Sequence, residues 1–397
     1  MAGNSKGNTA TGNARKSKSR SKNKMIIFAI EIFLILIMLA VLFLVMVSGN
    51  KGPKVVELDP DDLGINEDVL ASRNQGANEA VVNPGEIASG GYMNIALFGV
   101  DATTTNQLYK NSRSDCTMIA SINMDTGDIK LVSVYRDTYL NLGTDTYNKC
   151  NHAYSNGGAQ QAIKMLNMNL DMDITNFIAV NYRALIDLID GLGGIYIDVD
   201  KNELRDINNY QISIICEQTK HTETDSYGRY TYVPGEKDGY YPVQETGYQK
   251  LNGLQATAYC RIRKSLAGGD FDRAANQREV IKAIEEQAKK TDLATLTKVF
   301  NTVIDEIYTN LNSDDLLDLL GNINNYRIVE EGGFPEESMV TTANIGAKGS
   351  VVIPLDLEAN VEWLHEFLFE DDDYSVSDTV KECGSQIKTD TSKYLNR

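Results

Sequence analysis

Arginine and aspartate residues stand at the ends of several apolar segments of this chain. Four short segments carry them: FGVD, RSD, YRD and CRIRKSLAGGDFDRAANQ. The residues of interest in these segments are Asp101, Arg113, Asp115, Arg136, Arg261, Arg263, Arg273 and Gln277. Each segment alone is typical of a solvated loop end or a local ion pair. Together they place guanidinium and carboxylate groups at strand ends, where the loops of α/β sheets build sites.

The residue types in these segments favour phosphoryl transfer. Arginine is planar, always charged and able to bind phosphate with two parallel hydrogen bonds. Two carboxylates beside such a cluster suit Mg²⁺, which binds one or two carboxylates together with substrate phosphates. Asp101 and Asp115 are therefore the candidate metal ligands, and either could assist a base. The predicted chemistry neutralises a pyrophosphate, orients an attacking hydroxyl and stabilises the leaving group.

Other catalytic chemistries find little support in the sequence. The nucleotide-binding patterns GxGxxG and GxxxxGKS are absent, as is the GxSxG nucleophile elbow. The three histidines are too scattered for a zinc site, and for His152 we expect a structural hydrogen bond. The five cysteines show no CxxC spacing, so we expect mostly buried thiols, and the sequence does not assign a pairing.

Strand and helix patterns alternate from residue 93 onward. The predicted strands are MNIALFGV, CTMIASIN, IKLVSVY, NFIAVN, IYIDVD and ATAYCRIR, with DTGD joining the second and third as a hairpin. The predicted helices are GGAQQAIKMLNMNL, YRALIDLIDGLGG, AANQREVIKAIEEQAKK and two stretches near 293–308 and 313–320. Strand pairing in ATAYCRIR would point Arg261 and Arg263 to one face. The alternation predicts a layered α/β domain with a mixed sheet. Residues 205–247 are polar and lack a clear period, which predicts a long excursion over the surface.

The N-terminal segments indicate a membrane anchor. Residues 25–48 form one apolar run, which as a helix spans roughly 36 Å and can cross a bilayer. A cleaved signal peptide is the competing interpretation, but its apolar region is shorter and ends in small residues. Residues 1–24 carry seven basic residues and no acid, which predicts a cytoplasmic arm with the rest of the chain outside the cell.

The net charge limits the ligands that the chain could bind, and its composition predicts the remaining segment boundaries. The formal net charge of the chain is −17, and without the seven positive charges of residues 1–24 the remaining residues carry about −24, which argues against nucleic-acid binding. Residues 49–90 are predicted to be an extracytoplasmic linker. The catalytic domain is predicted to run over 91–375, with a core at 93–290 and C-terminal helices at 291–375. Residues 376–397 are predicted to be a polar tail.

The order of the motifs resembles the LytR–CpsA–Psr family. The motifs are FGVD, RSDCTMIASIN, IKLVSVYRDTYL, NHAYSNGG, IDGLGGIYIDV, LNGLQATAYCRIR and GDFDRAANQR. The resemblance implies a three-layer α/β/α domain with an apolar groove for a polyprenyl chain. It implies a membrane-bound phosphotransferase that moves a glycopolymer, such as teichoic acid or capsular polysaccharide, from a polyprenyl-pyrophosphate carrier to peptidoglycan.

The resemblance also implies roles for individual residues. Asp101 and Asp115 would hold Mg²⁺ or assist the base, and Arg113, Arg136, Arg261 and Arg263 would hold the pyrophosphate. Arg273 and Gln277 would complete the head-group site. The chain departs from the common family pattern at Cys116, Tyr135, Asp272 and Asn276. Two alternatives remain. A polyprenyl pyrophosphatase would use the same residues with water in place of the acceptor, and a non-catalytic module that binds lipid-linked precursors would keep the groove but tolerate the loss of Asp101 and Asp115.

Overall fold

A seven-stranded mixed sheet forms the centre of the molecule. The computed structural model describes residues 54–67, 69, 84, 91–102, 108–109, 111–263, 266–292, 295, 298–299, 302–303, 306–311 and 327–395. The strand order is β1-β10-β7-β2-β3-β4-β11. In chain order these strands are β1 (Lys54–Val55), β2 (Tyr92–Val100), β3 (Ser114–Asn123), β4 (Asp128–Val134), β7 (Asn176–Asn181), β10 (Ile307–Thr309) and β11 (Arg327–Phe334).

Strand direction brings several chain segments to one edge of this sheet. β2 runs parallel to β7, β4 runs parallel to β11, and β3 is antiparallel to both β2 and β4. The predicted hairpin between β3 and β4 is therefore confirmed. As a result β2, β4, β7 and β11 end, and β3 begins, at the same edge, which we call the site edge.

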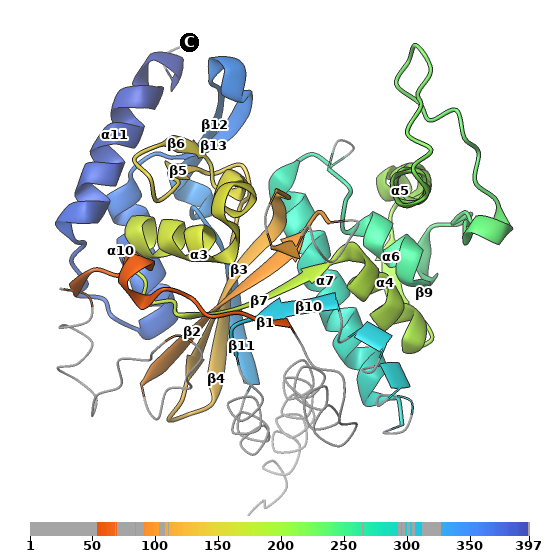
Figure 1. Ribbon diagram of the computed structural model, residues 1–397, viewed down its shortest axis with the longest axis horizontal. Coiled ribbons are helices and arrows are strands. Elements are labelled where there is room, and N and C mark those ends of the chain that lie inside the picture. The colour runs from red at the N-terminus through yellow and green to blue at the C-terminus, as the bar shows by residue number, and fades with distance from the viewer. Residues whose placement is uncertain are drawn as a thin grey trace, which may run out of the picture.

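Helices cover both faces of the sheet (Figure 1). One group packs around the larger apolar core and consists of α3 (Asn151–Leu170), α10 (Leu357–Phe369) and α11 (Asp378–Leu395). Ala96, Phe98 and Val100 alternate along β2 and point into that core. The second group forms its own apolar cluster and consists of α4 (Tyr182–Gly191), α5 (Lys201–Thr219), α6 (Gly253–Tyr259), α7 (Asp270–Lys289), β8 (Ile195–Val199) and β9 (Gly247–Leu251).

Two small hairpins lie beside the first group of helices. They are β5 (Tyr139–Asn141) with β6 (Tyr147–Lys149), and β12 (Val340–Asn344) with β13 (Ser350–Pro354). The Val352 backbone N–H donates to the Asp137 carbonyl oxygen over 2.9 Å, so β13 is attached to the chain that leaves β4. A central mixed sheet between helices confirms the mixed α/β class predicted from the sequence.

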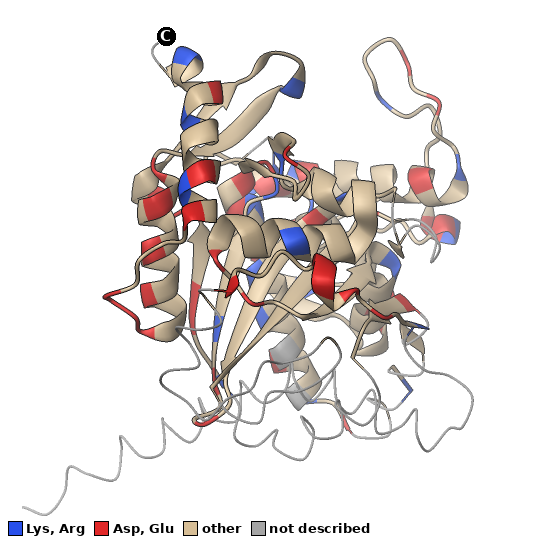
Figure 2. Ribbon diagram, turned by 60° about the vertical axis from the view of Figure 1, so that its left-hand side comes forward, with Lys and Arg blue, Asp and Glu red and all other residues tan. Residues whose placement is uncertain are grey.

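The prediction of a polar tail at 376–397 was wrong. These residues contain α11, whose Val380, Cys383 and Ile387 are buried against α10 and α3. Only one narrow stripe of this helix is apolar, and the rest of its surface carries both acidic and basic side chains. Figure 2 shows red and blue residues side by side in this part of the molecule. An 18-residue helix that buries so few side chains has the composition of a tail although it is part of the core.

The prediction of a strand at ATAYCRIR was also wrong. The segment is the short helix α6, after which the chain turns at Arg261 and Ile262. Asn252 and Gln255 form a capping box that starts this helix, because each side chain accepts a hydrogen bond from the other's backbone N–H. Arg261 and Arg263 therefore follow a helix end and do not alternate along a strand.

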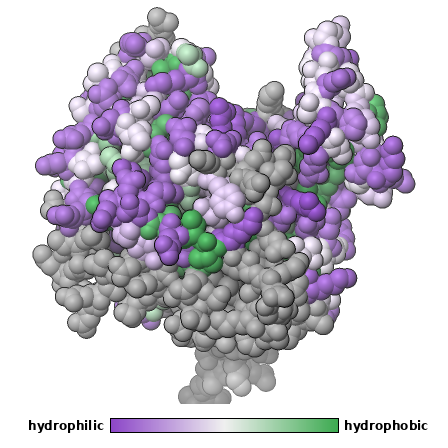
Figure 3. Space-filling view, viewed as in Figure 1, coloured by the Kyte–Doolittle hydropathy of each residue, from purple (hydrophilic) through white to green (hydrophobic). Residues whose placement is uncertain are grey.

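Three further boundaries differ from the sequence predictions. The predicted linker at 49–90 is not wholly a spacer, since β1 pairs with β10 and Leu63 is buried. The region 291–375 supplies strands β10 to β13 as well as α10, and β10 occupies the end of the helix predicted at 293–308. The excursion predicted at 205–247 begins inside α5, and only the part after Thr219 projects from the body, with a largely hydrophilic surface (Figures 1 and 3).

Several predicted segments lie outside the described residues. They are the basic arm at 1–24, the apolar run at 25–48, most of the linker and the helix at 313–320. Within the described ranges, none of the helices combines the length and apolarity needed to span a bilayer.

Candidate functional site

The site edge gathers three of the predicted charged segments. Asp101 follows β2, Asp115 is the second residue of β3, and Arg136 follows β4. The Asp101 backbone N–H donates to the Arg113 carbonyl oxygen over 3.0 Å, which ties the first two segments together. Strand pairing alone therefore places two carboxylates and a guanidinium beside each other.

Asp115 and Arg136 form an ion pair at the middle of this edge. The Arg136 Nη1 donates to Asp115 Oδ1 over 2.5 Å, and the Tyr182 hydroxyl donates to Asp115 Oδ2 over 2.9 Å. Burial acts to raise the pKa of Asp115, but Arg136, Arg273 and the Tyr182 hydroxyl outweigh it and hold the pKa below its ordinary value. Asp115 is thus held as a carboxylate with both oxygens engaged.

Asp101 is the second carboxylate of the site. Burial raises its pKa, and the nearby charge of Asp115 raises it further, against the opposing effect of Arg261. Two neighbouring carboxylates that repel each other, one of them partly desolvated, suit a hard divalent cation. The donor set of Asp101 and Asp115 therefore fits Mg²⁺ that completes its coordination with water and phosphate oxygens.

A cleft of about 340 Å³ opens beside Asp101 between α4, α5 and α6. Its lining includes Asp101, Tyr182, Ile186, Ile214, Glu217 and Arg261. The Arg261 Nη1 donates to Glu217 Oε2 over 3.0 Å, and its guanidinium lies 5.2 Å from the centre of the Tyr182 ring. The cleft thus combines a fixed positive charge with apolar side chains, as a ligand with a charged head and an apolar chain requires.

A second charged group continues the site past Arg136. The Arg263 Nη2 donates to Asp137 Oδ2 over 2.6 Å, and Lys149 Nζ lies 3.2 Å from Asp137 Oδ1. Asp270 pairs with Arg273. Burial raises the pKa of Asp270 despite the positive charge of Arg273. The Asp270 Oδ1 also lies 3.9 Å from Arg136 Nε. Asp137 and Asp270 thus hold the side chains of Arg136, Arg263, Arg273 and Lys149 close together.

Two buried guanidinium N–H groups in this cluster lack hydrogen-bond partners among the described residues. They are Arg136 Nε and Arg273 Nε. Buried polar groups in native structures are nearly always paired, and leaving one unpaired costs about 1–3 kcal/mol. Unused donors on two clustered arginines are what a site for a ligand's phosphate oxygens requires.

Not all of the predicted site residues point to the Asp115–Arg136 ion pair at the middle of the site edge. Arg113 is exposed and lies near His152, where burial first, and then the charges of Arg113 and Lys149, lower the histidine pKa. Gln277 Nε2 donates to the Cys260 carbonyl oxygen over 3.5 Å, which joins α7 to the end of α6. The roles inferred for these two residues remain predictions.

The sequence interpretation did not select several residues that shape the site. These are Asp137, Lys149, Tyr182, Glu217 and Asp270. Asp137 and Asp270 stood within the quoted motifs, and Tyr182 directly follows a predicted strand. Glu217 lies on α5, whose start carries the capping box of Asp200 and Glu203; that pattern could have revealed the helix.

Three of the four departures from the family pattern have structural explanations. The Tyr135 ring packs 4.3 Å from the Phe271 ring and lies over Gly333, where a Cβ would come within 2.0 Å of the Tyr135 hydroxyl. Asp272 accepts from the Gly268 backbone N–H over 2.7 Å, and Asn276 is buried with its amide directed to Glu203. These substitutions pack or cap the loops around the arginines.

Gly253→Ala should destabilise the fold through the helix that leads to Arg261. A Cβ at Gly253 would lie 2.2 Å from the Ile186 carbonyl oxygen, a backbone atom of α4 that cannot move alone. Overpacking of this kind costs about 1–3 kcal/mol, to be measured by urea unfolding. Gly235→Ala is the control, because its Cβ would meet nothing within 4 Å. Equal stability of the two variants would contradict the close packing of α6 on α4.

Comparison with known proteins agrees with the motifs and the site. The model of the LytR_cpsA_psr family matches residues 65–350. The chain is 29% identical over 229 residues to the Bacillus subtilis polyisoprenyl-teichoic acid–peptidoglycan teichoic acid transferase TagU, a match that covers 57% of this chain and 62% of the relative. It is 28% identical over 255 residues to the biofilm regulatory protein A of Streptococcus mutans, covering 60% of this chain and 56% of that protein.

A solved structure shares the fold. Protein gbs0355 from Streptococcus agalactiae superimposes with a TM-score of 0.55 at 24% identity, covering 72% of this chain and 90% of that one. The matches to the two sequence relatives span less than two thirds of their lengths. Since the family match covers most of the chain and includes the whole site edge, this protein belongs to the LytR_cpsA_psr family.

Proposed function

We propose that this protein transfers a glycopolymer from a polyprenyl-pyrophosphate carrier to peptidoglycan. The observation that carries the proposal is the cluster of Arg136, Arg263 and Arg273, with unpaired buried N–H groups, beside a pair of carboxylates. The overall charge of the chain repels polyanions, so such a cluster indicates a local phosphate site. Family membership and the name of the TagU relative support the same substrate class.

The residues of the site suggest how the reaction proceeds. Arg136 and Arg273 bind the pyrophosphate oxygens through their unused N–H groups, and Arg261 binds them at the cleft. Asp115 keeps Arg136 in place, and Tyr182 fixes Asp115. Asp101 lines the cleft and takes the proton of the acceptor hydroxyl. The acceptor oxygen bonds to the glycan-linked phosphorus as its bond to the bridging oxygen breaks, and polyprenyl phosphate leaves.

Magnesium enters the proposal as a cofactor of the same site. Asp101 and Asp115 would hold it, and the bound ion would neutralise further charge on the pyrophosphate.

We also propose that residues 25–48 anchor the chain, with residues 1–24 in the cytoplasm and the domain outside the cell. Protease treatment of intact cells should then digest the domain and spare the arm.

A transfer assay with the full chain in detergent tests the function and the metal together. We expect labelled glycan to move from a polyprenyl-pyrophosphoryl donor to peptidoglycan with Mg²⁺, and the activity to be lost with a chelator and restored by Mg²⁺. Asp101→Asn should lower the transfer rate by about a hundredfold or more at every Mg²⁺ concentration, because the variant lacks both the base and one anionic metal ligand. Release of label without attachment would indicate a pyrophosphatase, and tightly bound but unchanged donor a binding module. A rate of glycan transfer that does not depend on Mg²⁺ would refute the proposed role of Mg²⁺ as a cofactor.

A further inference from the structure

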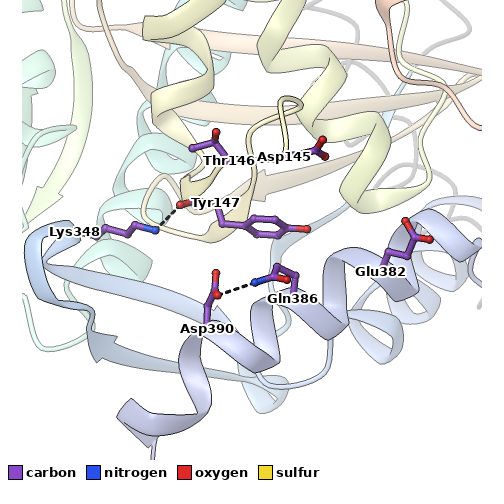
Figure 4. A pocket seen from close by; sticks show the side chains of 7 residues that line it. All are labelled: Asp145, Thr146, Tyr147, Lys348, Glu382, Gln386 and Asp390. Carbon is purple, nitrogen blue, oxygen red and sulfur yellow. Dashed lines mark hydrogen bonds between the residues drawn. The ribbon is translucent and has the colours of Figure 1, made fainter.

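A second cleft lies between the β5–β6 hairpin, the β12–β13 turn and α11 (Figure 4). Its volume is about 610 Å³. The residues that line it are Asp145, Thr146, Tyr147, Lys348, Glu382, Gln386 and Asp390. We call it the hairpin cleft. It lies apart from the arginine cluster and shares no lining residue with the cleft at Asp101.

The hairpin cleft is rigidly built on one side and open on the other. Lys348 Nζ donates to the Tyr147 carbonyl oxygen over 2.6 Å and to the Tyr139 hydroxyl over 2.9 Å. The Tyr139 hydroxyl donates to Asp390 Oδ2 over 2.9 Å. These bonds tie the two hairpins to α11 and use the only cation of the lining. Glu382 and Gln386, one helical turn apart on α11, are exposed to the opening.

The chemistry of the lining selects a neutral, hydroxyl-rich ligand. Carboxylates accept hydrogen bonds. The Gln386 amide donates one N–H to Asp390 Oδ1 over 2.8 Å (Figure 4), which leaves its second N–H and its carbonyl oxygen for a ligand. The Thr146 hydroxyl donates to the Thr144 carbonyl oxygen over 3.4 Å and can still accept, and the Tyr147 ring offers an apolar face with a polar tip. Sugar hydroxyls are themselves donors and acceptors, so they match this set. Three carboxylates with one engaged lysine disfavour phosphate, so the cleft and the arginine cluster select opposite kinds of ligand.

The hairpins connect the hairpin cleft to the site edge. Two residues separate Arg136 from β5, and at the end of β6 Lys149 pairs with Asp137. On the other side, Val352 of β13 is hydrogen-bonded to the Asp137 backbone. The β5–β6 hairpin is roughly 15 Å long from its base to its tip at Asp145, at a rise of about 3.3 Å per residue. An extended sugar chain in the hairpin cleft would therefore reach the arginine cluster.

We infer that the hairpin cleft binds the glycan chain of the acceptor and directs one of its hydroxyls toward Asp101. This inference rests on the proposed function for the identity of the acceptor. It assigns the two substrates to separate surfaces. The polyanionic donor binds the arginines, and the uncharged part of the acceptor glycan binds between β5–β6 and α11.

Binding measured without turnover tests the inference directly. The probe is a set of N-acetylglucosamine oligomers, which are uncharged and rich in hydroxyl groups, titrated against the full chain in detergent. Glu382→Ala/Gln386→Ala should weaken oligomer binding by about tenfold or more and leave binding of polyprenyl pyrophosphate unchanged. Lys388→Ala, exposed on the other side of α11, is the matched control and should bind as wild type.

Each outcome bears on the inference separately from the function. In the transfer assay the double variant should raise the KM for the glycan acceptor by a similar factor with little change in kcat. Glycan binding that depends on Glu382 and Gln386, in a protein that transfers nothing, would support the hairpin cleft and refute the proposed function. Equal glycan binding by the double variant and wild type, equal loss in Lys388→Ala, competition by pyrophosphate, or binding of stem peptides alone would overturn the inference.

Discussion

Replacement of Arg136 by alanine should reduce glycan transfer by about a thousandfold or more, the effect of removing a preorganised charged donor from a reaction site. Arg136 bonds Asp115, and its Nε has no hydrogen-bond partner among the described residues, so the variant loses both a proposed phosphate ligand and the partner that holds Asp115 ionised. Arg136→Lys should recover only part of the rate, because lysine keeps the charge but lacks the planar fork.

The measurement must separate chemistry from folding. Arg136→Ala leaves the partly buried carboxylate of Asp115 with Tyr182 but without its arginine, so thermal unfolding is recorded for each variant. Arg205→Ala is the control, since Arg205 is exposed and, among the residues that the structure describes, forms its ion pair with the neighbouring Asp206 at the start of α5. Wild-type transfer by Arg136→Ala, with a normal unfolding midpoint, would remove the arginine cluster from the mechanism.

Ile387→Ala on α11 should destabilise the protein by about 2–5 kcal/mol, the cost of truncating a fully buried isoleucine. Ile387 is 2% exposed and belongs to the main core with Val380 and Cys383. Since a domain is stable by only about 5–15 kcal/mol, this single change should lower the urea midpoint strongly. The measurement is equilibrium unfolding followed by circular dichroism.

Lys388→Ala provides the comparison for this prediction. The residue adjoins Ile387 on α11 but is exposed, and surface changes of this kind are usually within about 0.5 kcal/mol. Equal stability of Ile387→Ala and Lys388→Ala would mean that α11 contributes nothing to the core, as a true polar tail would. The pair therefore decides whether the C-terminal helix belongs to the folded domain.

Local signals in the sequence were sufficient for the strands that position Asp101, Asp115 and Arg136. Their apolar runs are long enough to specify buried strands, and DTGD specifies the turn between β3 and β4. Charged residues at the ends of such runs have to emerge at a sheet edge. The meeting of these three residues at one sheet edge could be predicted for that reason, and the order of the motifs was sufficient to predict the family.

Weak or competing local signals account for the errors. The apolar alternation in ATAYCRIR resembles a strand, but the capping box at Asn252 and Gln255 starts a helix and moves Arg261 and Arg263 into a turn. α11 carries too few apolar residues to be distinguished from a tail. In both cases packing against the rest of the chain, which a local pattern does not contain, decides the conformation.

The sequence by itself determined the fold class and the positions of Asp101, Asp115 and Arg136 at the ends of strands, because these depend on residue type and on position along a strand. Their roles toward phosphate and magnesium remain predictions. Only the tertiary structure decided which groups face each other. It paired Asp115 with Arg136 and Tyr182, brought Glu217 from α5 to Arg261, and placed α11 against two hairpins to form the hairpin cleft. Such contacts join residues far apart in the chain, so they arise from the packing of whole elements and leave no local pattern to detect.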